Sequence, residues 1–345
     1  MNFKILTVIF IILGMIIGSL ETLNFKFKKT YLIIGIFLLL CSFRSLKVPD
    51  TKEYLDVFEK MNTRIFDFQN FYFEKGFLVI SKLIKIIFKD NFVIYFFIIS
   101  FINLFFIKKF IQLNCKFYII PIMLYISFWG IYFNMVILRF GIAFSLYILS
   151  IYFFENKLKK YGIVLYILAI LFHKSFIFAI ISFFIKNKRY NKYIYLLLVF
   201  FIGIFYYSKS GNNIVLIIID KSLVFVSKIN VRYGIYIKNL KFEEGNSLRF
   251  FMNYLMLIIG ITMVKVKNKM FYKYLNIYIL GMFIQAFFSN ILLIERITDM
   301  FNGINFIVFS LIIEEIKSKK IKFVFFVSLV VVNFIFISRI IFKNL

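Results

Sequence analysis

Long apolar runs separated by short charged segments make up most of this chain. A bilayer core of about 30 Å requires about 20 helical residues, and most of the runs approach that length. We therefore predict an all-α polytopic membrane protein with about twelve transmembrane helices. The predicted spans are 3–20, 31–43, 91–107, 117–133, 137–154, 161–172, 176–185, 193–207, 249–264, 274–294, 297–313 and 323–341.

The two shortest runs, 161–172 and 176–185, are separated by His173, Lys174 and Ser175. As helices they would be about 18 and 15 Å long, and each is too short to cross the core upright. Two arrangements are open for residues 161–185. They form either one spanning helix with the polar residues at mid-bilayer, or a hairpin of two short, tilted helices with those residues at its tip.

Basic residues on both sides of this stretch favour the hairpin. Lysines within 157–160 precede it, and the basic cluster 186–192 follows it. The positive-inside rule assigns both clusters to the cytoplasmic face, which only a hairpin allows. The hairpin carries His173 and Lys174 to the outer side, where an ionisable residue at membrane depth is a functional hypothesis. The same rule places both termini outside and assigns these further basic loops to the cytoplasmic face: 26–29, 108–116, 265–273 and 317–322.

Two long segments fall on the outer side of what we predict to be a single integral membrane domain, residues 1–345. The first, 44–91, begins with polar residues and ends in an apolar stretch with lysines spaced three and four residues apart. This spacing is typical of an amphipathic helix at the membrane interface. The second, 208–248, mixes glycine and asparagine with an apolar run and Arg232. We interpret it as an interfacial element or lid over a cavity.

Composition supports the membrane assignment. Among the 345 residues 62% are hydrophobic, and the mean hydropathy of +0.91 excludes a soluble domain. The net charge of +27 would fit nucleic acid, but the basic residues alternate with apolar runs instead of forming one face. We therefore expect contact with anionic lipids and no nucleic-acid partner. No pair of cysteines or histidines has metal-ligand spacing, so we expect no metal and no cofactor.

Arg139 is the first candidate for chemistry, at the outer end of the predicted span 137–154. Gly141 follows it and allows a neighbouring helix to approach closely. An arginine at a span end can simply extend its charge to the lipid headgroups. Several cations that converge on one site instead suit a bidentate grip on phosphate or pyrophosphate. The cations predicted to share this outer level are Arg139, His173, Lys174 and Arg296.

Two carboxylates of the first outer segment are candidate general bases for a sugar hydroxyl. Asp50 follows a proline and precedes Thr51, so it is equally suited to cap a helix, with Glu53 as the returning acid. Glu74 precedes the amphipathic stretch and could serve only as a first-turn partner of that helix. A neutral His173 is a third candidate base.

Together these residues carry a resemblance to a known family. Over about residues 30–310 their order and spacing resemble the EpsG family of exopolysaccharide and O-antigen (Wzy-type) polymerases. Phe140 departs from the pattern, because the family often has glutamine after the arginine, so a hydrogen-bonding role at that position is in doubt. The matching residues are Arg44, Asp50-Thr51, Tyr54, Glu74-Lys-Gly76-Phe77, Arg139-Phe-Gly-Ile-Ala143, Phe172-His173-Lys174-Ser175 and Arg296 in Glu-Arg-Ile.

The resemblance implies a glycosyltransferase of the bacterial cytoplasmic membrane that joins undecaprenyl-pyrophosphate-linked repeat units on its outer face. Transfer from a lipid pyrophosphate leaves negative charge on the departing group, and fixed cations can stabilise that charge without a metal. Both donor and acceptor would be lipid-linked glycans, with membrane lipid and a chain-length regulator as further candidate partners. We expect catalysis by His173, Asp50 and Glu74, and substrate binding by Arg139, Lys174, Arg296, Arg44, Arg232 and Tyr54.

Two other functions fit part of the pattern. A ligase that transfers the glycan to another acceptor would use the same donor and the same cations. A flippase for the lipid-linked oligosaccharide would line its path with cations, but transporters commonly place charges through the midplane. Here the charges gather at one outer level, which favours an enzyme.

Overall fold

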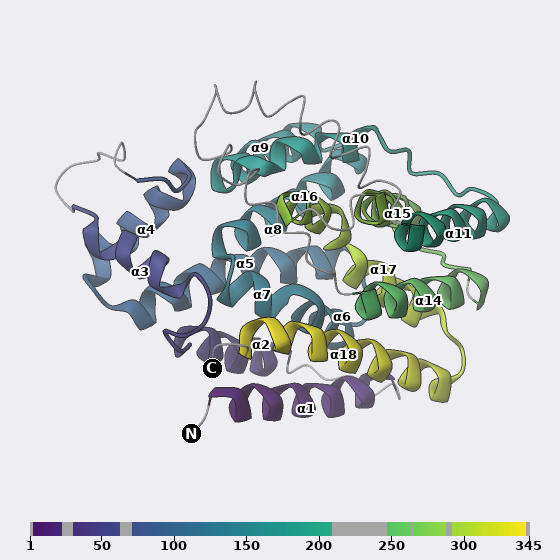
Figure 1. Ribbon diagram of the computed structural model, residues 1–345, viewed down its shortest axis with the longest axis horizontal. Helices are drawn as coiled ribbons and strands as arrows, with labels where there is room; N and C mark the ends of the chain where they lie inside the picture. Colours follow the sequence, from purple (N-terminus) through teal and green to yellow (C-terminus); the bar gives the residue numbers. More distant parts are fainter. Residues whose placement is uncertain are drawn as a thin grey trace. The chain divides into compact units, whose positions relative to one another are not determined.

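The computed structural model describes residues 3–22, 30–62, 71–208, 247–263, 265–287 and 292–342, and all regular structure among them is helical (Figure 1). The membrane-protein prediction is confirmed. The expected number of about twelve spans stays a prediction. The segments long and apolar enough to cross a membrane are Phe3–Thr22, Phe92–Asn114, Leu138–Glu155 and Arg296–Glu315. Shorter apolar helices cover Tyr31–Ser42, Ile119–Met135, Lys174–Phe184, Lys192–Tyr206 and Phe250–Thr262.

The chain divides into two compact units, Met1–Ile177 with Phe309–Leu345, and Phe178–Val308. In unit 1 the helices are α1 (Phe3–Thr22), α2 (Thr30–Ser42), α3 (Thr51–Lys60), α4 (Lys75–Phe88), α5 (Phe92–Asn114), α6 (Ile119–Tyr125), the π-helix η1 (Ile126–Gly130), α7 (Ile131–Met135), α8 (Leu138–Glu155), α9 (Lys159–Phe172) and α18 (Lys319–Phe342). In unit 2 they are α10 (Ile181–Phe184), α11 (Lys192–Ser208), α14 (Ser247–Met263), α15 (Phe271–Phe287) and α16 (Leu292–Asn302). The 3₁₀-helix η2 (Lys174–Ile180) and α17 (Asn305–Glu315) contain the two boundaries.

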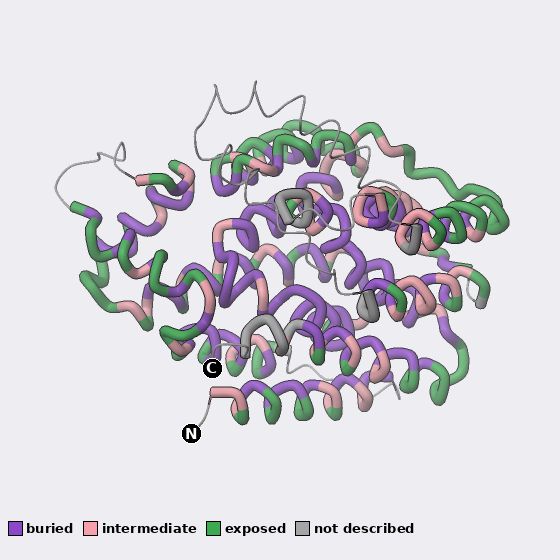
Figure 2. Tube along the Cα trace, viewed as in Figure 1, coloured by how far each residue is buried: buried purple, intermediate pink, exposed green. Residues whose placement is uncertain are grey.

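Helix α8 is the core of unit 1. Residues 140–151 are all buried, and Figure 2 shows the helix buried along most of its length. It packs against α5, α7 and α9. Close packing on α7 depends on Gly141, because a Cβ at this position would lie 2.6 Å from the Phe133 carbonyl oxygen. The close approach predicted from this glycine is confirmed.

The chain reverses direction just before α8. Residues 133 and 141 would be about 12 Å apart in a continuous helix, yet they touch. The reversal lies at Val136 and Ile137, between α7 and α8. It leaves Arg139 as the second residue of α8, at the end of the buried helix.

Helix α4 has the predicted amphipathic pattern, but its polar face is turned inward. Lys82 and Lys85 are only 1% and 8% exposed, whereas Leu83 and Ile87 are 47% and 68% exposed. The Lys85 ammonium donates to the carbonyl oxygens of Phe58 and Glu59, at 2.9 and 2.7 Å. These carbonyls lie in the last turn of α3, where that of Phe58 also accepts the Met61 N–H at 3.4 Å, and their attraction for the ammonium explains why the lysine side chain is buried.

The predicted run 297–313 is not one regular helix. It is interrupted by a turn at Gly303 and Ile304, between α16 and α17. The predicted run 274–294 likewise passes beyond the end of α15 at Phe287, and residues 288–291 lie outside the described part of the chain.

Residues 161–185 do not form a single helix. Helix α9 ends at Phe172, and the Tyr166 hydroxyl donates to the carbonyl oxygens of Phe176 and Ile177 at 2.8 and 3.1 Å. In a continuous helix, residues ten positions apart would be about 15 Å apart. The chain therefore turns back at His173, where the two apolar runs meet.

The other end of unit 1 collects the segments assigned to the cytoplasmic face. Glu314 Oε1 accepts a hydrogen bond from the backbone N–H of Lys116 at 2.7 Å. Nearby in sequence, the Ile120 N–H donates to Glu21 Oε2 at 2.8 Å. Because residues 116 and 314 are in contact, they lie on the same side of the membrane, and the chain between them crosses it an even number of times. The predicted spans in this range agree with that. A single helix at 161–185 would make that number odd, so these contacts favour the hairpin.

This topology is tested by cysteines introduced at the exposed positions Lys174 and Lys188. The native Cys41 and Cys115 are buried, which keeps background labelling low. In intact spheroplasts a membrane-impermeant maleimide should label Lys174→Cys, while Lys188→Cys should label only after permeabilisation. Equal labelling of both from one side would contradict the hairpin.

Candidate functional site

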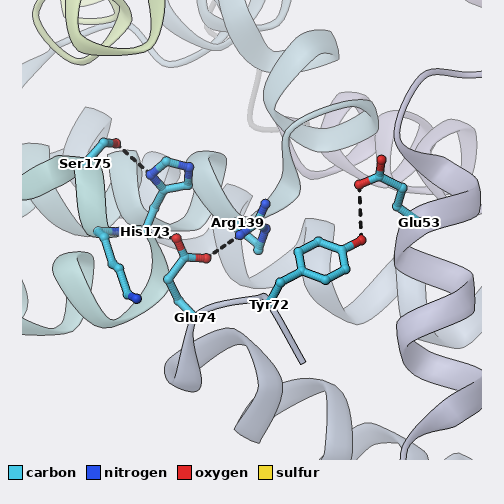
Figure 3. A network of polar contacts seen from close by, with 7 residues as sticks. Glu53, Tyr72, Glu74, Arg139, His173 and Ser175 are labelled. Carbon is cyan, nitrogen blue, oxygen red and sulfur yellow. Dashed lines mark hydrogen bonds and ion pairs between the residues drawn. The ribbon is translucent and has the colours of Figure 1, made fainter. Parts of the chain in front are cut away.

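Three segments distant in sequence meet at the outer predicted end of unit 1 (Figure 3). Glu74 lies directly before α4, Arg139 lies in the first turn of α8, and His173 follows the last residue of α9. Gly76 lets α4 start this close to the end of α9, because a Cβ there would lie 2.8 Å from the Leu171 carbonyl oxygen. Position 76, in the first turn of α4, therefore requires a residue without a side chain.

Glu74 links the three segments. Its Oε2 forms an ion pair with Nη1 of Arg139, and its Oε1 accepts a long hydrogen bond, 3.4 Å, from the backbone N–H of Lys174. The carboxylate makes no capping bond to α4. The side chains of Arg139 and Glu74 are 17% and 11% exposed. Glu74 thus serves as a partner between elements instead of capping its own helix.

Arg139 is held on several sides. The Phe73 ring lies under its guanidinium, 4.1 Å from ring centroid to Cζ, and the Tyr54 hydroxyl is close enough to interact with it electrostatically. Its Nε is buried and has no hydrogen-bond partner. The side chain therefore packs inward instead of extending to the headgroups. A cation in the first turn of a helix opposes the helix dipole, which makes the Glu74 carboxylate a necessary neighbour.

His173 ends α9, where its backbone N–H donates to the Ala169 carbonyl oxygen at 3.0 Å. Its side chain is oriented by Ser175, whose Oγ lies 2.6 Å from Nδ1. The Phe140 ring packs edge-on against the imidazole with a centroid separation of 5.3 Å. Phe140 is the position that departs from the family pattern, and here it supplies an apolar wall. Only 8% of His173 is exposed, so the ring has one fixed orientation.

The charge state of the site follows from these neighbours. Burial alone would raise the pKa of Glu74, but the Arg139 and His173 charges outweigh burial and hold the pKa below its ordinary value of 4.5. Glu74 is therefore ionised at neutral pH. Burial raises the pKa of Tyr54, which keeps its phenol protonated beside Arg139.

A second polar contact extends the site towards α3. The Tyr72 hydroxyl donates to Glu53 Oε2 at 3.2 Å (Figure 3). Burial, followed by the charge of Glu53, raises the pKa of Tyr72 to about 12. Phe73 and Tyr72 are not among the site residues predicted from the sequence. The signal available for them is the aromatic run directly before Glu74.

Arg44 binds backbone instead of lying open to solvent. Its Nε donates to the Cys41 carbonyl oxygen at 3.0 Å, and its Nη1 donates to that of Met135 at 2.8 Å. The guanidinium also lies over the Phe96 ring, 3.7 Å from its centroid. Burial lowers the pKa of Arg44 to about 10, so the group stays cationic. These contacts join the ends of α2 and α7 next to the chain reversal that precedes Arg139.

The remaining candidates have exposed side chains or fall outside the described residues. Asp50 is exposed and precedes α3 with a left-handed backbone, φ 59°, but its side chain makes no capping bond, so the capping interaction expected there does not form. The Lys174 side chain is exposed beside His173. Arg296 is an exposed residue of α16 in unit 2, and Arg232 falls outside the described part. The described residues thus bring together Tyr54, Glu74, Arg139 and His173, with the Lys174 backbone.

Comparison with known proteins gives one match. The model of the EpsG family matches residues 28–345, which includes every residue of the site described above. No curated protein and no solved structure matches the chain.

The lowered pKa of Glu74 predicts a pH dependence of stability. Folding favours the ionised carboxylate, so this stabilisation is complete above the ordinary pKa of 4.5 and is lost as the pH falls through the lower folded pKa. The melting temperature of the detergent-purified protein should fall more steeply below about pH 4.5 than that of Glu74→Gln. Glu53→Gln, which removes an exposed carboxylate, should behave like the parent. Parallel curves for the parent and Glu74→Gln would contradict the assignment.

Proposed function

Because the chain belongs to the EpsG family, we propose that it is a polysaccharide polymerase, a glycosyltransferase that joins lipid-linked oligosaccharide repeat units. The family itself is consistent with a glycosyltransferase-like polymerase. The observation that carries the proposal is the cluster of Glu74, Arg139 and His173. It combines an acid, a fixed cation and an imidazole at one end of a buried helix bundle.

The donor in this proposal is a glycan on undecaprenyl pyrophosphate. Arg139 and His173 bind its phosphates, and the exposed Lys174 side chain adds positive charge beside them. A guanidinium suits this task because its planar fork binds two phosphate oxygens at once. The low exposure of Arg139 strengthens the interaction, since little water competes for the charge. Arg296 and Arg232 stay predictions as further substrate contacts.

The transfer step needs a base and a stabilised leaving group. The acceptor hydroxyl oxygen attacks the anomeric carbon of the donor sugar, and the bond from that carbon to the phosphate oxygen breaks. The electron pair leaves with the lipid pyrophosphate, whose charge Arg139 and His173 stabilise. The hydroxyl proton passes to the Glu74 carboxylate, which is ionised at neutral pH. Asp50 stays an alternative base, because it is exposed and close enough to Tyr54 to interact with it electrostatically.

We place this reaction on the outer face of the bacterial cytoplasmic membrane. The support is the distribution of basic loops, which assigns the site and the 44–91 segment to the outer side. Donor and acceptor would both reach the site from the surrounding lipid. A chain-length regulator that contacts the membrane domain would be a further partner.

The function is tested with the purified chain in nanodiscs, supplied with lipid-linked repeat units. Polymerase activity predicts products of several repeat units, still attached to the lipid. Movement of the lipid across the bilayer without longer products would indicate a flippase. Transfer to a different acceptor without extension would indicate a ligase. Either result would contradict the proposal.

Arg139→Lys should keep the positive charge but lose the second hydrogen bond to phosphate. Charge-assisted hydrogen bonds contribute about 1.5–3 kcal/mol, so extension should slow about 10- to 100-fold at equal protein abundance. Arg189→Lys, at an exposed position in unit 2, is the matched control and should extend chains like the parent. Normal extension by Arg139→Lys would mean that Arg139 has only a structural role.

A further inference from the structure

In the structure Glu74 holds the groups that an anionic substrate would need. Its carboxylate engages Nη1 of Arg139 and the backbone N–H of Lys174, and it lies close enough to His173 to interact electrostatically. A guanidinium, a backbone N–H and an imidazole are the groups that commonly bind a phosphate. The carboxylate therefore stands where phosphate oxygens would be expected.

Building on the proposed function, we propose that Glu74 is an internal competitor of the donor pyrophosphate. It holds these anion-binding groups until the pyrophosphate binds and then leaves Arg139. Glu74 then determines both the affinity for the donor and the moment at which a free carboxylate becomes available.

The geometry of Arg139 explains why both anions cannot bind it fully at the same time. Bidentate binding of phosphate requires two neighbouring guanidinium nitrogens. Nε is buried and faces no partner, so an edge that includes it is closed to a ligand. The edge formed by the two Nη atoms is left, and Glu74 already holds Nη1. Nη1 carries two N–H groups, but a phosphate on this edge would lie beside the carboxylate on the same nitrogen, and repulsion between the two anions displaces Glu74.

Displacement would also change Glu74 as a base. The Arg139 and His173 charges now lower its pKa, and a carboxylate with a lowered pKa accepts a proton weakly. Once those cations bind phosphate, their attraction for Glu74 falls and its pKa rises. The carboxylate is then a stronger base when the donor is present, which couples proton removal from the acceptor to donor binding.

The simplest alternative is that Glu74 only orients Arg139. The two ideas predict opposite effects on anion binding. An orienting partner aids binding, so its removal weakens the affinity for an anion. A competitor opposes binding, so its removal strengthens that affinity.

The experiment measures binding of inorganic pyrophosphate to the full chain in nanodiscs by calorimetry. Glu74→Gln should bind pyrophosphate about 10-fold or more tightly than the parent, since the variant lacks the charge-assisted bond that the ligand must break. It should also lose chain extension. Asp56→Asn removes an exposed carboxylate from the neighbouring α3, outside the contacts of the site, and should match the parent in both assays. Unchanged or weaker pyrophosphate binding by Glu74→Gln would overturn the proposal.

Two further variants keep the result interpretable. Arg139→Gln should abolish the tighter binding in the Glu74→Gln background; binding that survives would come from other cations and would overturn the proposal. If Glu74→Gln does not fold, Glu74→Asp keeps the charge but shortens its reach, and it should raise pyrophosphate affinity by a smaller factor. Failure of the parent to extend chains, with tighter binding by Glu74→Gln, would reject the polymerase and keep the competitor.

Discussion

A guanidinium in a low-dielectric environment needs an anion, and in this protein the anion for Arg139 comes from a distant segment. Arg139 lies in the first turn of α8, where the helix dipole adds to the unfavourable charge. Glu74 removes that conflict by pairing with it from the residue before α4. The pairing requires α4, α8 and α9 to end or begin at the same place. The chain reversal before α8 and the turn at His173 both lead to this point.

The surrounding contacts hold those breaks in position. Gly141 allows α8 to pack closely on α7, and Gly76 allows α4 to start beside the end of α9. Arg44 binds the carbonyl oxygens that end α2 and α7, just before the chain turns towards Arg139. Lys85 does the same for the end of α3. Arg44 and Lys85 would each be costly to bury alone, and each donates hydrogen bonds to carbonyl oxygens at helix ends. Both cations therefore have a structural role.

Hydropathy located the helices because apolar length is the property that a bilayer selects, and the runs that end at Ser42, Glu155 and Phe172 match the structure within two residues. Which side of each helix is buried was harder to predict. Periodicity identified α4 as amphipathic, but not that Lys82 and Lys85 would be the buried side, since this depends on the carbonyls of α3. The residues that carry the family resemblance include Glu74, Arg139 and His173, which the structure brings together, and their roles in substrate binding and catalysis stay predictions. The contact between Glu74 and Arg139 joins residues 65 positions apart, so local sequence pattern could not predict it. Nothing in the sequence indicates that Arg44 binds backbone carbonyl oxygens.

The central claim is that the cluster of Glu74, Arg139 and His173 binds the lipid pyrophosphate. The most direct test is a cryo-electron microscopy structure of the chain in nanodiscs with an undecaprenyl-pyrophosphate-linked glycan bound. The account predicts phosphate density within hydrogen-bonding distance of Arg139 and His173, with the Glu74 carboxylate turned away from the guanidinium. Phosphate density elsewhere, with the Glu74–Arg139 ion pair unchanged, would contradict it.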